Sequence, residues 1–361
     1  MDSELFDISL KAQGGRLKVE NLPSGLATLF SRIRFRAEQF IQSGLRVNPS
    51  MPPVYFDFVD NPSINAFATK DEYRKYIGLT DGAVMVFHML FARLMADPRV
   101  LSHIGNISIE QTNLPPLSIL PKSIRDWTSQ PVLPHDPLRR EVFHHLTQIV
   151  LDFLVGHEFT HLVNGHVDYL SARHGIMVLD EKETSVSEEG ALIRQTLEWD
   201  ADCIAVCHAM GNCVQRIRDL NLTAGPIKQF YRNPTDAFLL VYFAISAFFR
   251  IFGDVDFTEA GLLKSDYPPM RHRQVVAMGT ATTYIMEKAE DLMGANNEAV
   301  SLSIQATEPA FANIIAGAKA VTGLKTAIGK VGSDHSNRLR NFWKTKLRSD
   351  LEPFAYHTLP E

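Results

Sequence analysis

The chain has few cysteines, and the three that it has lie together at Cys203, Cys207 and Cys213. An odd, clustered set is not typical of a disulfide framework, so it indicates a reducing compartment. A second metal site built from Cys203, Cys207 and His208 is the less favoured interpretation. Cysteines at helical spacing among alanine, isoleucine and valine are usually reduced core residues.

Long hydrophobic runs are also lacking. The longest, Ala237 to Phe249, is interrupted only by Ser246 and is followed by Arg250. A membrane-spanning helix needs about 20 apolar residues, so this run predicts a buried core helix and no membrane span. The first residues, M-D-S-E-L-F-D-I, are acidic and lack the basic-then-apolar order of a signal peptide. We therefore expect a cytoplasmic protein.

Neither sign of charge is in large excess, since the net charge is −5. Bulk electrostatics therefore gives no reason to expect nucleic-acid binding. A chain of 361 residues is long enough for a large core and about two domains. We expect an N-terminal helical adaptor segment over 1–50, a central domain over 51–300, and a C-terminal helical segment with a basic tail over 301–361. The oligomeric state does not follow from the sequence.

Local patterns predict a mainly helical central domain with one small sheet. Alternating β-branched and aromatic residues favour strands at Pro52–Asp60, Ile64–Thr69 and Tyr76–Thr80. Apolar residues at helical spacing favour helices over 26–45, 81–96, 136–165, 191–210, 237–252 and 310–321, and another that ends near 292. Prolines across 98–135 exclude long helices and central strands there, so we expect an insertion that could act as a lid over a cleft.

The helix expected over 136–165 has clear local signals at both ends. Asp136 is a good N-cap, and Pro137 suits the first helical position, where its missing N–H costs nothing. Gly165 suits the end of the helix. The apolar residues between them recur at helical spacing. The sequence therefore predicts one long helix that ends just after the motif described next.

Near the end of this helix stands H-E-F-T-H, which contains His157, Glu158 and His161. Histidines four residues apart lie one above the other on the same helix face, so they can bind one metal ion together. Glu158 is rotated by about 100° from His157 and can stand beside the metal without binding it. Two imidazoles on zinc and a glutamate that takes a proton from the metal-bound water are what metal-assisted hydrolysis requires.

A catalytic zinc needs a third protein ligand and an open position for water. Glu198, on the later helix, is the best candidate, and His166 is the competing one. His166 is five positions after His161 and faces away if the helix continues. The metzincin spacing H-x-x-G-x-x-H does not fit H-L-V-N-G-H. Asp202, one turn after Glu198, can orient a ligand imidazole through its other N–H.

Four motifs together resemble the gluzincin metallopeptidases of the CAAX prenyl protease and HtpX type. They are H-E-F-T-H-L-V-N-G-H, L-E-W-D-A-D, I-N-A-F-A-T with the following Y-I-G-L-T-D-G-A-V, and Y-P-P-M-R-H-R. They occur in family order and span about residues 65–273. The family carries H-E-x-x-H and then E-x-x-x-D on a later helix. The match of four ordered motifs is far more specific than H-E-x-x-H alone.

The resemblance implies one zinc ion per chain, bound by His157, His161 and Glu198. It implies that Glu158 is the general base and that Asp202 supports the ligands. The fold that it implies is α+β, a mainly helical zincin-type domain with a small antiparallel sheet bordering the active-site helix. The transmembrane helices of many family members have no counterpart here.

The resemblance also implies a substrate-binding strand and two further catalytic residues. The strand comprises Asn65, Ala66, Phe67 and Ala68, which would bind a protein or peptide substrate as an added strand. Tyr267 stands where the family usually has histidine, and its phenol could donate to an oxyanion or could simply pack. Arg273 matches the family arginine, and an internal salt bridge is an equal alternative for it.

The sequence thus predicts a zinc-dependent peptidase, an endopeptidase, that hydrolyses peptide bonds through a metal-bound water with Glu158 as base. One alternative is a non-catalytic binding or regulatory protein on the same scaffold. A fourth protein ligand such as His166 or Asp168 would support that alternative. A metal hydrolase acting on another bond is a third option, because fold does not fix substrate.

Overall fold

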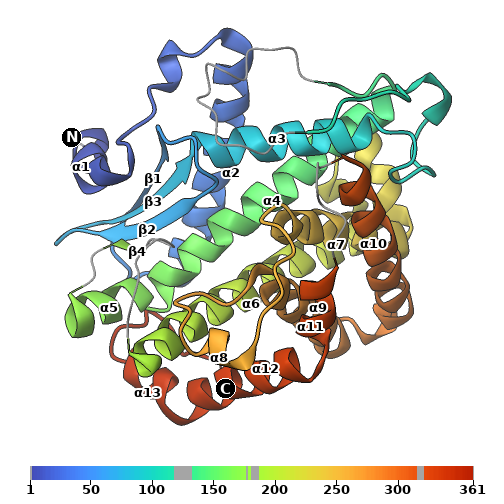
Figure 1. Cartoon of the computed structure of the whole chain (residues 1–361). Helices are drawn as coiled ribbons and strands as arrows, with labels where there is room; N and C mark the ends of the chain where they lie inside the picture. Colours follow the sequence, from blue (N-terminus) through green and yellow to red (C-terminus); the bar gives the residue numbers. More distant parts are fainter. Residues whose placement is uncertain (1, 118–131, 176–177, 180–186, 315–320, 361) are drawn as a thin grey trace.

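The computed structural model describes residues 2–117, 132–175, 178–179, 187–314 and 321–360. Helices make up most of the molecule, and one small sheet lies on the side of the N-terminus (Figure 1). This is a mainly helical α+β architecture, as the sequence predicts. No helix within the described ranges is both long and apolar enough to cross a membrane.

The four strands are β1 (Val54–Val59), β2 (Ala66–Lys70), β3 (Lys75–Thr80) and β4 (Val178–Leu179), in the spatial order β1-β3-β2-β4. β2 is antiparallel to β3 and to β4, whereas β1 is parallel to β3. The sheet is therefore mixed, and the prediction of an antiparallel sheet was wrong for β1.

The connection between β1 and β2 explains this order. Thr80, at the end of β3, donates its backbone N–H to the carbonyl of Asn65 over 3.1 Å, and Gly82 donates to Asn61. The connection thus crosses the end of β3 and carries the chain to the far side of that strand. Alternation of residues predicts that a segment is a strand but does not say which strand lies beside it.

Helix α4 (Pro137–Val163) carries the H-E-F-T-H motif and has the ends that the sequence predicts. The Asp136 side chain accepts a hydrogen bond from the Arg139 N–H over 2.9 Å. Gly165, with φ 77°, ends the helix in the left-handed conformation. A Cβ at Gly165 would lie 2.4 Å from the carbonyl carbon of Phe354, so only glycine fits here.

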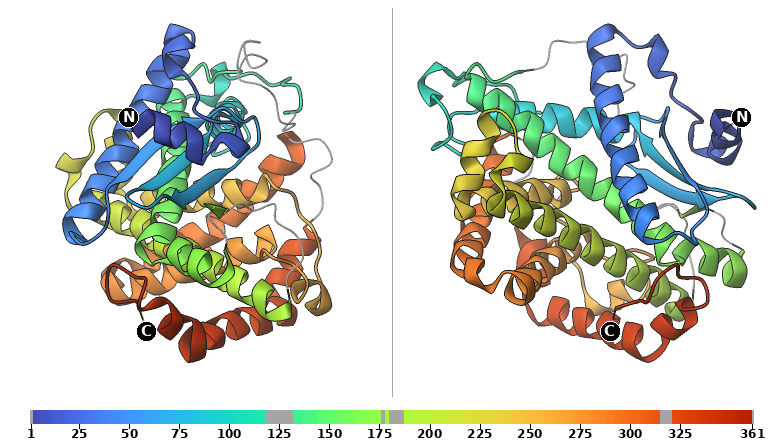
Figure 2. Two further views of the ribbon diagram at one scale, coloured as in Figure 1. Left: turned by 90° about the vertical axis from the view of Figure 1, so that its left-hand side faces the viewer. Right: turned by 180° about the vertical axis from the view of Figure 1, so that it is seen from behind.

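α4 separates two parts of the molecule. The sheet, α2 (Ser24–Val47) and α3 (Asp81–Met95) lie on one side of it, and α6 (Glu188–Arg218) with the later helices lies on the other (Figures 1 and 2). The side chain of Thr80 caps α3 by accepting a hydrogen bond from the Ala83 N–H. The motif helix is thus held between the sheet and the helical layer.

α6 and the helices that follow it form the second part. Within this part, α7 is buried along almost its whole length, as its apolar run predicts. α10 packs along α7, although only its end falls within a predicted helix, and α6 is longer than the predicted 191–210. The remaining helices are α1 (Asp2–Ser9), α5 (His166–His174), α7 (Pro234–Arg250), α8 (Glu259–Leu262), α9 (Met270–Lys288), α10 (Met293–Ile314), α11 (Thr322–Ile328), α12 (Lys330–Phe342) and α13 (Arg348–Leu351), with a π-helical turn at Trp343–Leu347.

The predicted insertion over 98–135 is only partly described, because 118–131 lie outside the described residues. Its first part is anchored to α4 by the buried guanidinium of Arg139. That group donates to the carbonyls of Met95, Asp97, Val100, Leu101 and Ile104 over 2.6–3.1 Å. The proposed role as a lid and the division into three segments remain predictions.

Candidate metal centre

Two helices supply the candidate ligands. α4 and α6 pack against each other, and His157 and His161 of α4 face Glu198 of α6. One candidate ligand atom from each of the three lies within 4.8 Å of the other two, and all three side chains are buried. The structure therefore brings together the three residues that the sequence predicts as metal ligands.

The arrangement of the three side chains fits a metal ion. The Nε2 atoms of His157 and His161 lie 3.0 Å apart. They lie 3.3 and 3.4 Å from the carboxylate oxygens of Glu198. Two neutral imidazoles cannot present lone pairs to each other at this distance without a proton or a cation between them. This buried group could hold a metal ion.

Asp202 and Arg273 support the group from the side of His157. Nδ1 of His157 lies 3.0 Å from Oδ1 of Asp202. Arg273 donates to both oxygens of Asp202, over 2.7 and 3.0 Å, and lies 3.2 Å from Glu198. Asp202 thus lies where it can orient the His157 ring, as the sequence predicts. Arg273 makes the internal salt bridge that was one of its two predicted roles.

The pKa values of the two histidines differ, because the carboxylates act more strongly on His157 than on His161. Burial lowers the pKa of His157, but Asp202 and Glu198 outweigh it and raise that pKa to about 10. Burial dominates at His161 and lowers its pKa to about 4, despite Glu198. Burial would raise the pKa of Glu198, yet Arg273 and the histidines hold it well below its ordinary value. The proton on His157 therefore stands where a metal ion would bind, and metal uptake must displace it.

His166 contacts His161 and does not join the group. α4 ends at Val163, and the chain turns at Gly165 before α5. Nδ1 of His166 then lies 2.9 Å from Nδ1 of His161, on the side of that ring away from Glu198. The sequence pattern indicates His166 only as a competing ligand. The contact with His161 could not be predicted, because it depends on how the chain turns after α4.

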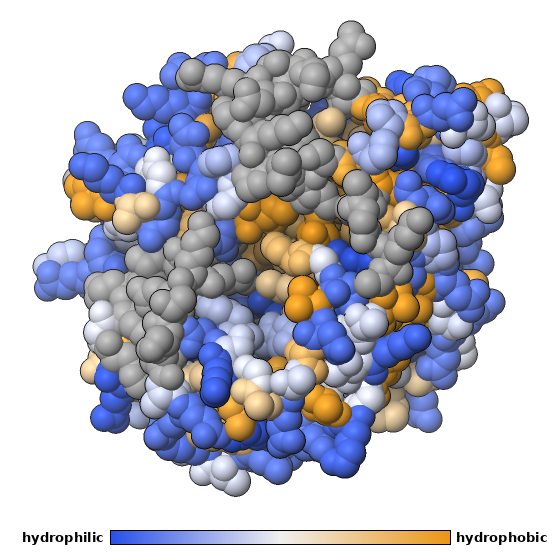
Figure 3. All heavy atoms as spheres, viewed as in Figure 1, coloured by the Kyte–Doolittle hydropathy of each residue, from blue (hydrophilic) through white to orange (hydrophobic). Residues whose placement is uncertain are grey.

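A small cavity of about 20 Å³ lies beside the group, and Glu158 forms part of its wall. Asn65 and Ala66 line it with His157, Glu158 and Arg273. Its apolar lining consists of Ile64, Phe153, Leu154, Phe248 and Phe252. The face of the molecule seen in Figure 3 is hollowed at its centre, where hydrophobic residues show between hydrophilic ones. The pocket offers an apolar environment next to the candidate base.

The residues of the predicted substrate strand have different surroundings. Asn65 and Ala66 line the pocket. Phe67 packs on the opposite face of the sheet with Phe6 and Tyr76, and Ala68 is buried and pairs with β4. Only the start of the predicted strand therefore faces the candidate centre.

Tyr267 is half-buried and lies outside the residues that line this pocket. Its backbone carbonyl accepts a hydrogen bond from the Ser265 hydroxyl over 2.7 Å. Its catalytic role therefore remains a prediction.

The three cysteines carry free thiols. Cys203 contacts the hydroxyl of Thr280 over 3.2 Å, and burial raises the pKa of Cys207 to about 11 and of Cys213 to about 12. Over the described parts of the chain, the His157 group is the one cluster of three or more such ligand residues close enough to hold a metal.

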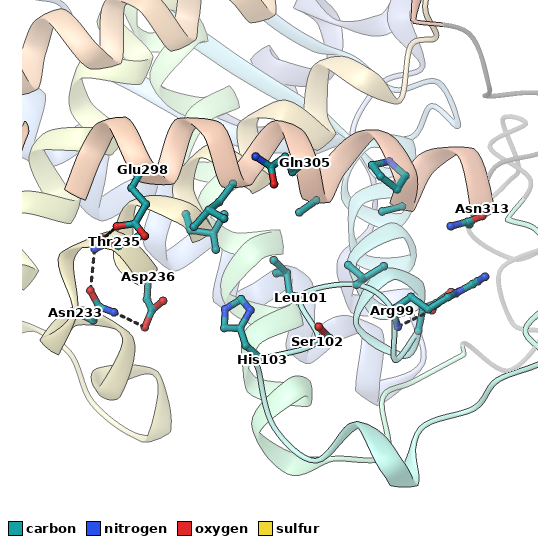
Figure 4. Close-up of a pocket in the computed structure, with 17 residues that line it drawn as sticks. Arg99, Leu101, Ser102, His103, Asn233, Thr235, Asp236, Glu298, Gln305 and Asn313 are labelled. Carbon is teal, nitrogen blue, oxygen red and sulfur yellow. Dashed lines mark hydrogen bonds and ion pairs between the residues drawn. The ribbon is translucent and has the colours of Figure 1, made fainter. Parts of the chain in front are cut away.

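A second pocket lies far along α7 and α10 from this centre. It is lined by the loop after α3, the start of α7 and the length of α10 (Figure 4). Thr235 is hydrogen-bonded to Glu298, and Asn233 to Asp236. None of the predicted site residues lines it.

Comparisons with protein-family models, with curated proteins and with solved structures found no match to this chain.

Proposed function

We propose that this chain is a zinc-dependent peptidase whose centre is formed by His157, His161 and Glu198. The observation that carries the proposal is the buried convergence of these three side chains, with Glu158 beside them at the wall of a pocket. Two imidazoles and one carboxylate are the protein ligands of many catalytic zinc sites, which keep a further position open.

In this proposal, zinc supplies a Lewis acid that polarises the scissile carbonyl and makes water more acidic. Glu158 removes a proton from the attacking water and delivers it to the leaving amine. The water oxygen forms a bond to the carbonyl carbon as the C–N bond breaks. Asp202 and Arg273 hold His157 and Glu198 in place. Asn65 and Ala66, at the wall of the cavity, would contact the substrate backbone.

A purely structural metal site is less well supported, because the two candidates for a fourth ligand are engaged elsewhere. Nδ1 of His166 faces Nδ1 of His161. The carboxylate of Asp168 pairs with Lys70, at 2.7 Å, and with Lys75. A closed four-ligand site would require one of these residues to turn towards Glu198, so their present contacts favour catalysis over a structural role.

The first test is the zinc content of three proteins, measured by elemental analysis after preparation without added metal. We expect about one zinc per wild-type chain, as for one centre, and the same in Glu158→Gln. We expect little or none in Glu198→Ala. A wild type that stays without zinc even after reconstitution would contradict the proposal.

Catalysis is tested with a proteome-derived peptide library read by mass spectrometry. Glu158→Gln should lose about 10²- to 10⁴-fold in cleavage rate while it keeps its zinc, because the base is removed and the ligands are not. Glu141→Gln is the matched control, since Glu141 is an exposed residue of the same helix. Full activity in Glu158→Gln would show that Glu158 is not the base.

A further inference from the structure

A line of buried polar side chains runs from His161 to α6. Nδ1 of His161 lies 2.9 Å from Nδ1 of His166. Nε2 of His166 lies 3.2 Å from Oδ2 of Asp200, an ion-pair contact in which the ring N–H is not aligned for a hydrogen bond. The same oxygen accepts a hydrogen bond from the side-chain amide of Asn164 over 2.5 Å. All four residues are at most 2 % exposed, so no solvent competes for these contacts.

The chemistry of these groups limits where the protons can be. An ionised carboxylate only accepts hydrogen bonds, so the nitrogen of His166 that faces Asp200 is expected to carry a proton. A neutral His166 then has its lone pair on Nδ1, and His161 must donate from its own Nδ1. The lone pair of His161 is left on Nε2, the atom that faces His157 and Glu198.

We propose that His166 and Asp200 are positioning residues that fix His161 in the one tautomer able to bind a metal through Nε2. This inference rests on the proposed metal centre. It adds a role for two residues that do not touch the metal. Because Asp200 favours a proton on Nε2 of His166, His166 accepts at Nδ1, and His161 keeps its own proton on Nδ1. The opposite tautomer of His166 would place two donors against each other or leave Nε2 of His161 protonated.

Each of the two proposed ligand histidines is then oriented by a carboxylate, one directly and the other through a second imidazole. His157 faces the carboxylate of Asp202 directly, at 3.0 Å. His161 reaches its carboxylate through an intervening imidazole. Ligand histidines usually give their second ring N–H to a carboxylate, a carbonyl or a water. Here a second histidine fills that place, because Gly165 turns the chain so that His166 lies beside His161.

Nitrogen NMR on the zinc-loaded, ¹⁵N-labelled wild type tests the proton positions directly, and His166→Asn assigns the His166 signals by their loss. We expect neutral His166 with its proton on Nε2, and His161 with its proton on Nδ1. A His166 protonated on Nδ1, or on both nitrogens, would overturn the inference. The measurement needs neither a substrate nor activity.

Zinc affinity, measured by competition with a chromophoric chelator, tests the consequence. His166→Phe keeps a ring but removes the acceptor, so zinc binding should weaken by about 10- to 100-fold. His166→Asn keeps an oxygen at the place of Nδ1 and should stay within a few-fold of the wild type. His88→Phe, in α3, is the matched control and should leave the affinity unchanged.

The outcomes separate this inference from the proposed function. A wild type without measurable zinc affinity would remove the proposed centre itself. A wild type that binds zinc, with folded His166→Phe of equal affinity, would remove only the positioning role. If His166→Phe does not fold, the tautomers seen in the wild type and the affinity of His166→Asn still decide. An Asn variant as weak as a folded Phe variant would also contradict the role of the acceptor.

Discussion

Two of the buried histidine pairs in the described residues, one at the candidate centre and one away from it, have nearly the same ring separation. The rings of His157 and His161 are 4.7 Å apart between centroids, and those of His272 and His335 are 4.9 Å apart. The first pair comes from one helix, and the second joins α9 to α12. Only the first belongs to a group that could hold a metal. The comparison therefore shows what a histidine pair needs beyond proximity.

The difference lies in the partners of the rings. The first pair faces the carboxylates of Glu198 and Asp202, and the pKa of His157 rises to about 10. Nε2 of His272 faces the carbonyl of Gly332 and the hydroxyl of Ser336. Burial lowers the pKa of His272 to about 4 and of His335 to about 3. Nearby carboxylates therefore distinguish a histidine pair that could bind a cation from one that makes only a buried contact.

The largest effect should follow removal of the carboxylate that faces both Nε2 atoms. In Glu198→Ala, His157 and His161 still share a proton between their Nε2 atoms but have no third ligand beside them. We expect its zinc affinity to fall by more than the roughly 10- to 100-fold that a merely supporting residue costs. Chelator competition measures this, and Glu189→Ala, an exposed residue of the same helix, should not change it. An affinity that survives in Glu198→Ala would mean that another residue is the third ligand.

A smaller effect should follow removal of the carboxylate behind His157. Asp202→Ala leaves Nδ1 of His157 and the guanidinium of Arg273 without their acceptor. We expect zinc affinity to fall by about 10- to 100-fold. Asp202→Asn keeps one acceptor oxygen and should lose less. Equal losses in the two variants would indicate that charge matters here and the direction of the hydrogen bond does not.

Local signals in the sequence predict what the backbone decides locally. The cap at Asp136, the stop at Gly165 and the spacing of His157 and His161 all depend on neighbouring residues. Glu198 could also be found, because two carboxylates on one side of an apolar helix need a partner. Together, these signals predict the helix, the helix face on which the two histidines lie, and the kinds of ligand atom at the candidate site.

The contacts that sequence analysis missed join residues whose proximity depends on packing. Asp200 contacts Asn164 across 36 positions of the chain, and the packing of α4 on α6 brings Asp200 to His166, just after the turn at Gly165. The parallel neighbour of β1 and the length of α10 likewise depend on which elements lie side by side. A single sequence carries composition and periodicity, and neither fixes such neighbours.

A carboxylate introduced beside His272 tests whether carboxylates cause the difference between the two pairs. The hydroxyl of Ser336 lies 2.9 Å from Nε2 of His272. Ser336→Asp would place an anion there, and an opposite charge within a few ångströms favours the protonated imidazole. We expect the pKa of His272 to rise from about 4 towards its ordinary value of about 6.5. A proton NMR titration measures it, with Ser336→Asn as the uncharged control. An unchanged pKa would contradict the role given to carboxylates.

The smallest effect is a dependence of stability on pH that comes from the second pair. His335 is 5 % exposed, and burial, then His272 and Arg338, lower its pKa to about 3. It is therefore neutral in the folded protein near pH 5, whereas in the unfolded chain its pKa is about 6.5. Unfolding between these values takes up a proton, so its contribution to stability is complete above about pH 6.5 and declines as the pH falls. In His335→Phe the fall in unfolding free energy from pH 6.5 to 5 should be shallower by up to about 1.4 kcal/mol per pH unit. Urea unfolding at several pH values measures the slope. At a histidine with a raised pKa the sign would be opposite. An equal slope in both proteins would mean that His335 is already protonated in the fold.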